Sequence, residues 1–272
     1  MKKNICVTIL TICLAVCLGL CMDIAEEKVK NMPVNSVPTQ YDTIDNKPSG
    51  WGFKKIKNSE PDIPKSTEDE LIENGAYYID PERPKVMYLT FDEGYENGYT
   101  EKILDVLKEK QVPAAFFITG PYAKKETELV KRMIDEGHIV GNHTVNHPNM
   151  PKLATYDAIS SELLELNKTV KELYNYDMKY MRPPEGEYSK RVLAIARDMG
   201  FRTVLWSFAY KDWDIKNQKG KEYAISEVTP YFHDGAVLLL HAVSSDNADA
   251  LAEIIDSARS MGYEFASLDN IK

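Results

Sequence analysis

Two adjacent acidic residues, Asp92 and Glu93, end an apolar run of β-forming residues that begins at Val86. Such a run is typical of a buried strand. A buried charge without compensation is costly, so two carboxylates at this place need a reason. In parallel α/β folds, catalytic groups gather at the carboxyl ends of strands. We therefore treat Asp92 and Glu93 as candidate site residues; the alternative is a solvated acidic turn closed by Gly94.

Two of the five histidines, His143 and His147, lie four residues apart just after another predicted strand. On a helical turn, residues at this spacing share one face, and two imidazoles on one face can bind one metal ion. Pro148 follows at once and indicates irregular backbone. A surface loop without a metal is therefore the alternative.

A proline-stiffened loop, Arg182-Pro183-Pro184-Glu185-Gly186, follows a third predicted strand. The two prolines fix the direction of the next backbone amides. Arg182 is suited to pair with a buried carboxylate, because its guanidinium stays charged and presents a fork of donors. Taken alone, the segment is equally typical of a plain rigid loop.

The last two candidate groups follow strands in the second half of the chain. Asp212 and Trp213 come after a predicted strand that ends at Trp206, and an acid beside an indole is common in sugar-binding sites. A core position for Trp213 is the alternative. His241 ends the buried run LLLH, where a structural histidine and a catalytic one are both plausible.

These residues are positioned by an alternation of short apolar runs and amphipathic stretches. The predicted strands are Val86–Phe91, Ala114–Thr119, His138–Asn142, Tyr180–Arg182, Thr203–Trp206, Ala236–His241 and one near Phe265. The predicted helices are Thr100–Lys110, Glu126–Glu136, Tyr156–Tyr174, Ser189–Met199 and Asn247–Met261. Repeated strand–helix alternation indicates a parallel sheet, most simply a β/α barrel or a fragment of one.

The amino terminus has a different composition. Lys2 and Lys3 precede an apolar run from Ile5 to Cys21 that contains all four cysteines. This pattern predicts a signal peptide or N-terminal anchor over residues 1–21, and hence export of a domain without disulfides. A polar, proline-containing tether is predicted over 22–64, and the domain over 65–272. The net charge of −9 argues against nucleic acid as a partner, because phosphate contacts need a basic surface.

Taken together and in order, these segments resemble the five motifs of the polysaccharide deacetylases with the NodB-homology domain, carbohydrate esterase family four. The five segments are TFDEG from Thr90, HTVNH from His143, RPPEG from Arg182, DW from Asp212 and LLLH from Leu238. Longer stretches, such as TFDEGYENGYT and LLLHAVSSDNADAL, look most like the delta-lactam-forming branch from spore-forming bacteria. The resemblance covers nearly all of the chain after the leader, and it implies a distorted or incomplete (β/α) barrel.

The resemblance also implies a metal site and a catalytic base. A divalent metal ion, zinc or another, would be held by His143, His147 and position 93. The family usually has Asp there, so Glu93 is a departure and its role as a ligand is open. Asp92 matches the catalytic base, which takes a proton from the attacking water.

The remaining motif residues match supporting roles in the same family. Arg182 would pair with the base and keep it ionised. The backbone N–H of Glu185 would stabilise the oxyanion, since a backbone donor tolerates a change of side chain. His241 would be the general acid for the departing amine, with Asp212 orienting it. The small acetyl pocket would be lined by Trp213, Leu239 and Leu240.

The implied activity is metal-dependent de-N-acetylation of N-acetylmuramic acid in peptidoglycan, leading to the muramic delta-lactam of spore cortex. The partner would be peptidoglycan glycan strands, and the location extracytoplasmic, in the cell wall or forespore cortex region. One alternative is deacetylation of another N-acetylglycan. A second, from a different class, is a non-catalytic glycan-binding module, because Glu93 departs from the family pattern. Catalysis needs Asp92 and His241, whereas a binding module needs neither.

Overall fold

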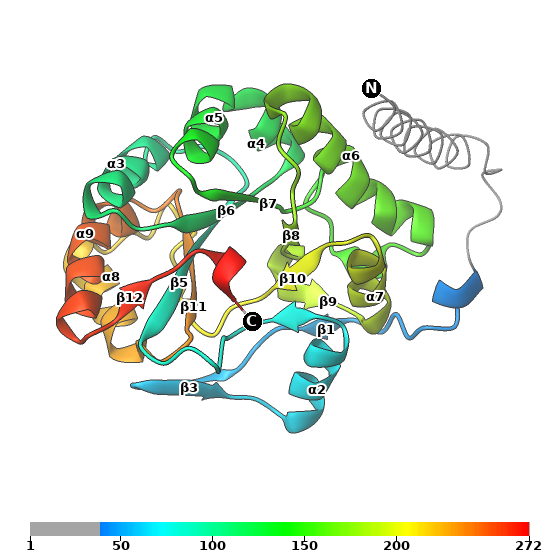
Figure 1. The fold of residues 1–272 in the computed structure, drawn as a ribbon, viewed down its shortest axis with the longest axis horizontal. Helices are drawn as coiled ribbons and strands as arrows, with labels where there is room; N and C mark the ends of the chain where they lie inside the picture. Colours follow the sequence, from blue (N-terminus) through cyan, green and yellow to red (C-terminus); the bar gives the residue numbers. More distant parts are fainter. Residues whose placement is uncertain (1–38, 272) are drawn as a thin grey trace, which may run out of the picture. The chain divides into compact units, whose positions relative to one another are not determined.

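The computed structural model describes residues 39–271 (Figure 1). The predicted leader over 1–21 and the first part of the predicted tether lie outside the described residues. Within residues 39–271, no helix is both long and apolar enough to cross a membrane.

The centre of the molecule is a curled sheet of mostly parallel strands, in the order β11-β5-β6-β7-β8-β10-β4, with β12 also paired to β5. The strands are β4 Ala76–Tyr77, β5 Val86–Glu93, β6 Ala114–Ile118, β7 Ile139–Asn142, β8 Tyr180–Met181, β10 Arg202–Val204, β11 Val237–His241 and β12 Glu264–Phe265. The two ends of this order, β11 and β4, are linked in the described chain only by an isolated bridge beside them, from Ile79 to Ala236. The predicted incomplete β/α barrel is therefore confirmed.

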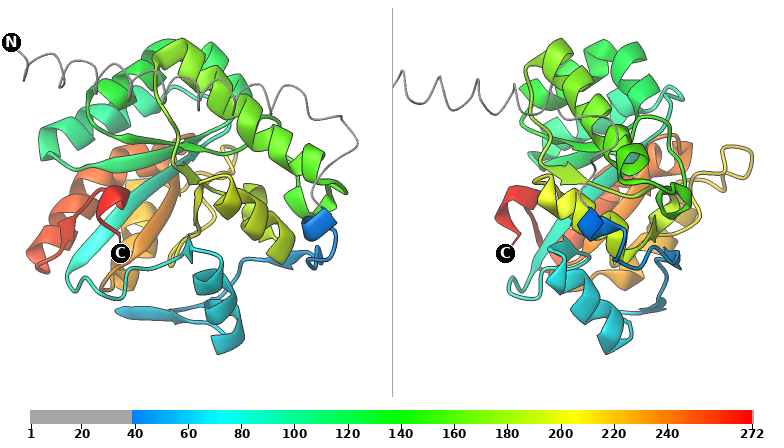
Figure 2. Two further views of the ribbon diagram at one scale, coloured as in Figure 1. Left: turned by 45° about the vertical axis from the view of Figure 1, so that its right-hand side comes forward. Right: turned by 90° about the vertical axis from the view of Figure 1, so that its right-hand side faces the viewer.

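Helices surround the outside of this sheet (Figures 1 and 2). They are α2 Lys65–Glu73, α3 Thr100–Lys110, α4 Gly120–Lys125, α5 Thr127–Asp135, α6 Tyr156–Tyr174, α7 Lys190–Asp198, α8 Lys221–Val228 and α9 Ser245–Ser260. Short 3-10 turns are η1 Thr39–Tyr41, η2 Met150–Lys152, η3 Pro184–Gly186, η4 Thr229–Tyr231 and η5 Leu268–Asn270. The predicted spans of α3 and α6 match the structure, and those of α5, α7 and α9 agree within two residues.

Strand β5 shows how the two faces of the sheet differ. Alternate side chains of a strand point to opposite faces. Met87, Leu89 and Phe91 belong to the main core cluster together with buried residues of α3 and α9. Tyr88 belongs instead to a second cluster inside the curl, with Phe117 and Val204 among others. This alternation also decides where the two acids at the end of β5 point.

The predicted tether is shorter than expected, because residues 40–64, here called the N-terminal arm, pack onto the domain. The compact unit begins at Gln40. In the arm, β1 Ser49–Gly50 pairs with β9 Glu187–Tyr188, and β2 Lys54–Ile56 pairs with β3 Ser59–Asp62. Trp51 is buried among aromatic and aliphatic side chains. Aromatic burial and strand pairing outweigh the polar, proline-containing composition from which a free tether was predicted.

Candidate active site

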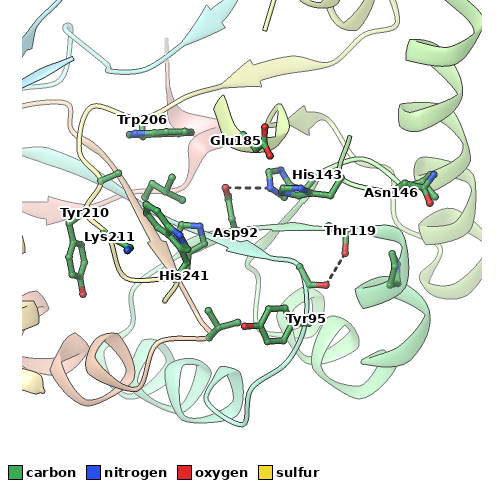
Figure 3. Close-up of a pocket in the computed structure, with 18 residues that line it drawn as sticks. Asp92, Tyr95, Thr119, His143, Asn146, Glu185, Trp206, Tyr210, Lys211 and His241 are labelled. Atoms are coloured by element: carbon green, nitrogen blue, oxygen red, sulfur yellow. Dashed lines mark hydrogen bonds and ion pairs between the residues drawn. The ribbon is translucent and has the colours of Figure 1, made fainter. Parts of the chain in front are cut away.

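A cavity of about 970 Å³ opens at the carboxyl ends of the parallel strands. That volume suits a small ligand. Figure 3 shows the side chains that surround it. Its lining includes Asp92, Tyr95, His143, His147, Glu185, Trp206, Lys211, Trp213, Leu239 and His241. The structure thus brings together residues that are separated by up to 149 positions in the chain.

Asp92 and Arg182 form a buried ion pair beneath the cavity. Arg182 Nη1 donates to Asp92 Oδ1 at 2.7 Å, and Nη2 donates to Thr90 Oγ1 at 2.9 Å. The Arg182 side chain is fully buried and its Nε donates to Val204 O at 2.9 Å. Burial alone would raise the pKa of Asp92, but the charge and hydrogen bond of Arg182, together with His143 and His241, hold that pKa below its usual value. Asp92 is therefore ionised at neutral pH.

His143 and His147 lie together, although not on the helical turn that their spacing suggested. Thr144 and His147 have positive φ angles of 68° and 55°, so the segment is an irregular loop, as Pro148 indicated. The two imidazole rings are 4.9 Å apart between centroids. His143 Nε2 is 3.6 Å from Asp92 Oδ2 (Figure 3).

The other ring nitrogen of His143 is held by the backbone. Its Nδ1 donates to Arg182 O at 2.8 Å, which leaves Nε2 directed at Asp92. A backbone acceptor of this kind is typical of metal-binding imidazoles. Burial lowers the pKa of His143 to about 4, so the ring is neutral and Nε2 can act as an acceptor or ligand.

Glu93 points away from the cavity, on the helix-facing side of β5. Its side chain is fully buried, and Oε1 accepts a long hydrogen bond of 3.5 Å from Thr100 Oγ1 at the start of α3. Its Oε2 has no partner within the described residues. Burial and the nearby charges of Glu96 and Asp92 raise the pKa of Glu93 well above its ordinary value. The structure does not bring Glu93 to the two histidines.

On the other side of Asp92, His241 is tied to Asp212. His241 Nδ1 donates to Asp212 Oδ1 at 2.7 Å, and the backbone N–H of His241 donates to Oδ2 at 2.8 Å. Asn247 Nδ2 also donates to Oδ2, at 2.6 Å. Burial alone would lower the pKa of His241, but Asp212 raises it through its charge and hydrogen bond. His241 is therefore held in one orientation with its Nε2 edge available.

The loop that follows β8 places Glu185 at the cavity. Glu185 has a φ of 60°, and the next residue, Gly186, has a φ of 67°. A Cβ on Gly186 would lie 2.8 Å from the Trp206 ring and 3.1 Å from Trp51 Cβ, so glycine is required by space as well as by conformation. The N-terminal arm thus packs directly against this loop.

Of the residues predicted to line the acetyl pocket, Trp213 and Leu239 line the cavity and Leu240 does not. Trp213 is half exposed and its ring lies 5.6 Å from that of His241. Leu239 lines the cavity, whereas Leu240 belongs to the main core cluster on the opposite face of β11. Because strand side chains alternate, these neighbours cannot both face the cavity.

Sequence reasoning missed several side chains at this site. Thr90 accepts from Arg182, Asn247 holds Asp212, and Trp206, Tyr95 and Lys211 line the cavity. Tyr95 and Lys211 lie within three residues of predicted site residues, and this proximity was an available signal. Asn247 lies six positions after His241, within the stretch LLLHAVSSDNADAL, but its partner Asp212 lies 35 positions away.

Comparison with known proteins agrees with this geometry. Residues 80–204 match the family model described as polysaccharide deacetylase. The peptidoglycan-N-acetylmuramic acid deacetylase PdaA of Bacillus subtilis is 44% identical over 85% of this chain and 89% of its own length. Its solved structure superposes with a TM-score of 0.81 at 43% identity, over 84% of this chain and 98% of that one.

A more distant structural relative is described as a pseudoenzyme. A family 4 carbohydrate esterase pseudoenzyme from Bacillus anthracis is 28% identical, with a TM-score of 0.67 over 72% of this chain and 68% of its own. Likeness of fold alone therefore does not distinguish an enzyme from a pseudoenzyme. The distinction depends on the side chains of the site.

Proposed function

Because the chain belongs to the polysaccharide deacetylase family, we propose that it hydrolyses the N-acetyl group of N-acetylmuramic acid in peptidoglycan and releases acetate. The observation that carries this proposal is that Asp92 and His241 line one cavity, each with a charged partner. Asp92 is paired with Arg182, and His241 is paired with Asp212. The named activity of the 44% identical relative supports the choice of substrate.

The proposed reaction begins with Asp92. Its low pKa, maintained by Arg182, leaves the carboxylate free to take a proton from a water molecule that attacks the acetamide carbonyl. His143 Nε2, which lies 3.6 Å from the same carboxylate, would help to orient that water. The backbone N–H of Glu185 would donate to the carbonyl oxygen as it becomes negative.

The second half of the reaction needs an acid. His241 has a raised pKa and therefore carries a proton more readily than an ordinary histidine at neutral pH. It would donate that proton to the amide nitrogen as the carbon–nitrogen bond breaks, which leaves acetate and the amine of the sugar. Asp212 stabilises the imidazolium and fixes the ring.

Two of the three predicted metal ligands fit a divalent ion. His143 and His147 lie together and His143 has the expected backbone support, whereas Glu93 points to the opposite face of the sheet. Within residues 39–271, no three His, Cys, Asp or Glu side chains are arranged to hold a metal. The ion, zinc or another divalent metal, would be held by His143 and His147, and when bound it would polarise the acetamide carbonyl.

The finer parts of the proposal concern place and pathway. We propose that the protein is exported through its N-terminal segment and acts on cell-wall or cortex peptidoglycan, and that its product leads to muramic delta-lactam. The apolar run from Ile5 to Cys21 supports export.

The decisive experiment measures acetate release from peptide-free peptidoglycan glycan, with and without added zinc, beside an N-acetylglucosamine oligomer. We expect release from the muramic acid residues. Release from the N-acetylglucosamine oligomer alone would replace this proposal with the alternative of another N-acetylglycan. No release from any glycan, with tight binding retained, would favour the glycan-binding module.

A further inference from the structure

One cation at the cavity has no role in the proposed reaction. Of the described residues that line the cavity, Lys211 is the only lysine or arginine. Its side chain is 60% exposed, and its Nζ lies 3.4 Å from Asp214 Oδ2. An exposed ion pair of this kind contributes little to stability, so the ammonium group can exchange Asp214 for another carboxylate at low cost.

The substrate of the proposed function carries such a carboxylate. In muramic acid, a lactyl ether on carbon 3 stands beside the acetamide on carbon 2. Once the stem peptide is absent, this lactyl group ends in a free carboxylate. A site that holds the acetamide over Asp92 must therefore accommodate an anion close by.

The charges around the cavity are distributed unevenly. Glu185 lies on the His143 side of Asp92, and Lys211 lies on the opposite side, with His241 (Figure 3). An anionic substituent would be repelled by Glu185 and attracted by Lys211. Trp213, two residues further along, supplies an exposed ring on the same loop for the apolar face of a sugar.

We infer that Lys211 binds the free lactyl carboxylate of the muramic acid that is deacetylated, and that it makes the enzyme prefer peptide-free over peptide-bearing or amidated muramic acid. This inference rests on the proposed function and adds a residue that selects the substrate. Lys211 is a specificity residue and takes no part in proton transfer.

The test compares wild type, K211M and K211R on two forms of one peptide-free glycan. One form has the free lactyl carboxylate, and in the other this carboxylate is converted to a neutral methyl amide. K211M should lose about tenfold in kcat/KM on the carboxylate form, mainly through KM, because a charge-assisted contact to the bound substrate is removed. It should match wild type on the amide form, and K211R should retain the preference.

Lys216 supplies the matched control, because it is an exposed lysine of the same loop that does not line the cavity. K216M should behave as wild type on both glycans. Equal loss by K211M on both forms, or no loss on either, would overturn the inference while leaving the proposed function intact. A wild type that releases no acetate from either muramic acid glycan would overturn both.

Discussion

The Asp92 carboxylate keeps its charge in a nearly closed environment because Arg182 lies against it. Only 9% of the Asp92 side chain is exposed, and none of Arg182. Removing one partner of a buried pair leaves the other charge uncompensated. The Asp92–Arg182 pair therefore supports both the ionised state of the proposed base and the stability of the domain.

We expect Asp92→Asn to lower the rate of acetate release by about 10²–10⁴-fold, because the proton acceptor is lost. The same change should reduce the free energy of unfolding by about 3 kcal/mol, since Arg182 stays buried without its partner. Rate assays and denaturant unfolding measure the two effects. Turnover equal to wild type would contradict the assignment of the base, and unchanged stability would contradict the role of the pair.

Glu93 should behave as a neutral buried acid. The pKa of Glu93 in the folded chain is raised above the ordinary 4.5. As the pH rises above 4.5, the unfolded chain therefore loses this proton before the folded chain does, and the free energy of unfolding falls. Glu93→Gln should therefore raise the unfolding temperature at pH 8 and leave it nearly unchanged at pH 4. Glu101→Gln, at an exposed position of α3, is the control. Destabilisation by Glu93→Gln at pH 8 would indicate an ionised, partnered carboxylate.

The Asp212–His241 pair predicts the pH dependence of kcat/KM. Activity should fall in acid as Asp92 is protonated, below the usual range of an aspartate. It should fall in alkali as His241 loses its proton, above its ordinary 6.5. Asp212→Asn removes the charge that raises the pKa of His241, so the alkaline limb should move to lower pH. An unmoved limb would show that another group sets it.

At the scale of elements, the N-terminal arm stabilises the loop that carries Glu185. Trp51 N–H donates to Gly186 O at 2.9 Å, and Trp51 Nε1 donates to Trp206 O at 2.8 Å. The indole also packs against Tyr78, with ring centroids 5.2 Å apart. Trp51 therefore joins the arm to two segments at the cavity, to the Glu185 loop through its backbone and to Trp206 through its indole.

Trp51→Phe keeps most of this packing but removes the indole N–H. We expect a loss of about 1 kcal/mol in stability from one hydrogen bond. We also expect a lower kcat/KM, because the indole N–H holds the backbone of Trp206, whose side chain lines the cavity. Phe53→Leu, which alters the ring next to Trp51 without touching the cavity, is the control. A change confined to stability would reduce Trp51 to a packing residue.

At the scale of the whole molecule, the compact unit begins at Gln40. A chain that begins at Thr39 should fold and release acetate as the full chain does. A chain that begins at Lys65, the start expected from composition, lacks β1 and Trp51 and should unfold at a lower temperature with reduced activity. Equal behaviour of the two shortened chains, by thermal unfolding and acetate assay, would show that the arm is dispensable.

Much of the architecture follows from local pattern. The strand and helix spans from Val86 onward come from hydrophobic periodicity. Short parts of the fold, such as β1 to β3 and α8, were not predicted, because contacts with distant segments stabilise them more than their own composition does.

For the site, the sequence by itself determined which residue types lie at the strand ends, and hence the candidates Asp92, His143, Arg182, Asp212 and His241. Only the tertiary structure decided which of them face one cavity. Asp92 and Glu93 are neighbours in the chain, yet strand alternation sends one to the cavity and the other to the helices. The distance of 2.7 Å between Arg182 Nη1 and Asp92 Oδ1 depends on the curl of the sheet. The curl brings together residues that are 90 positions apart, and no local sequence pattern indicates this contact.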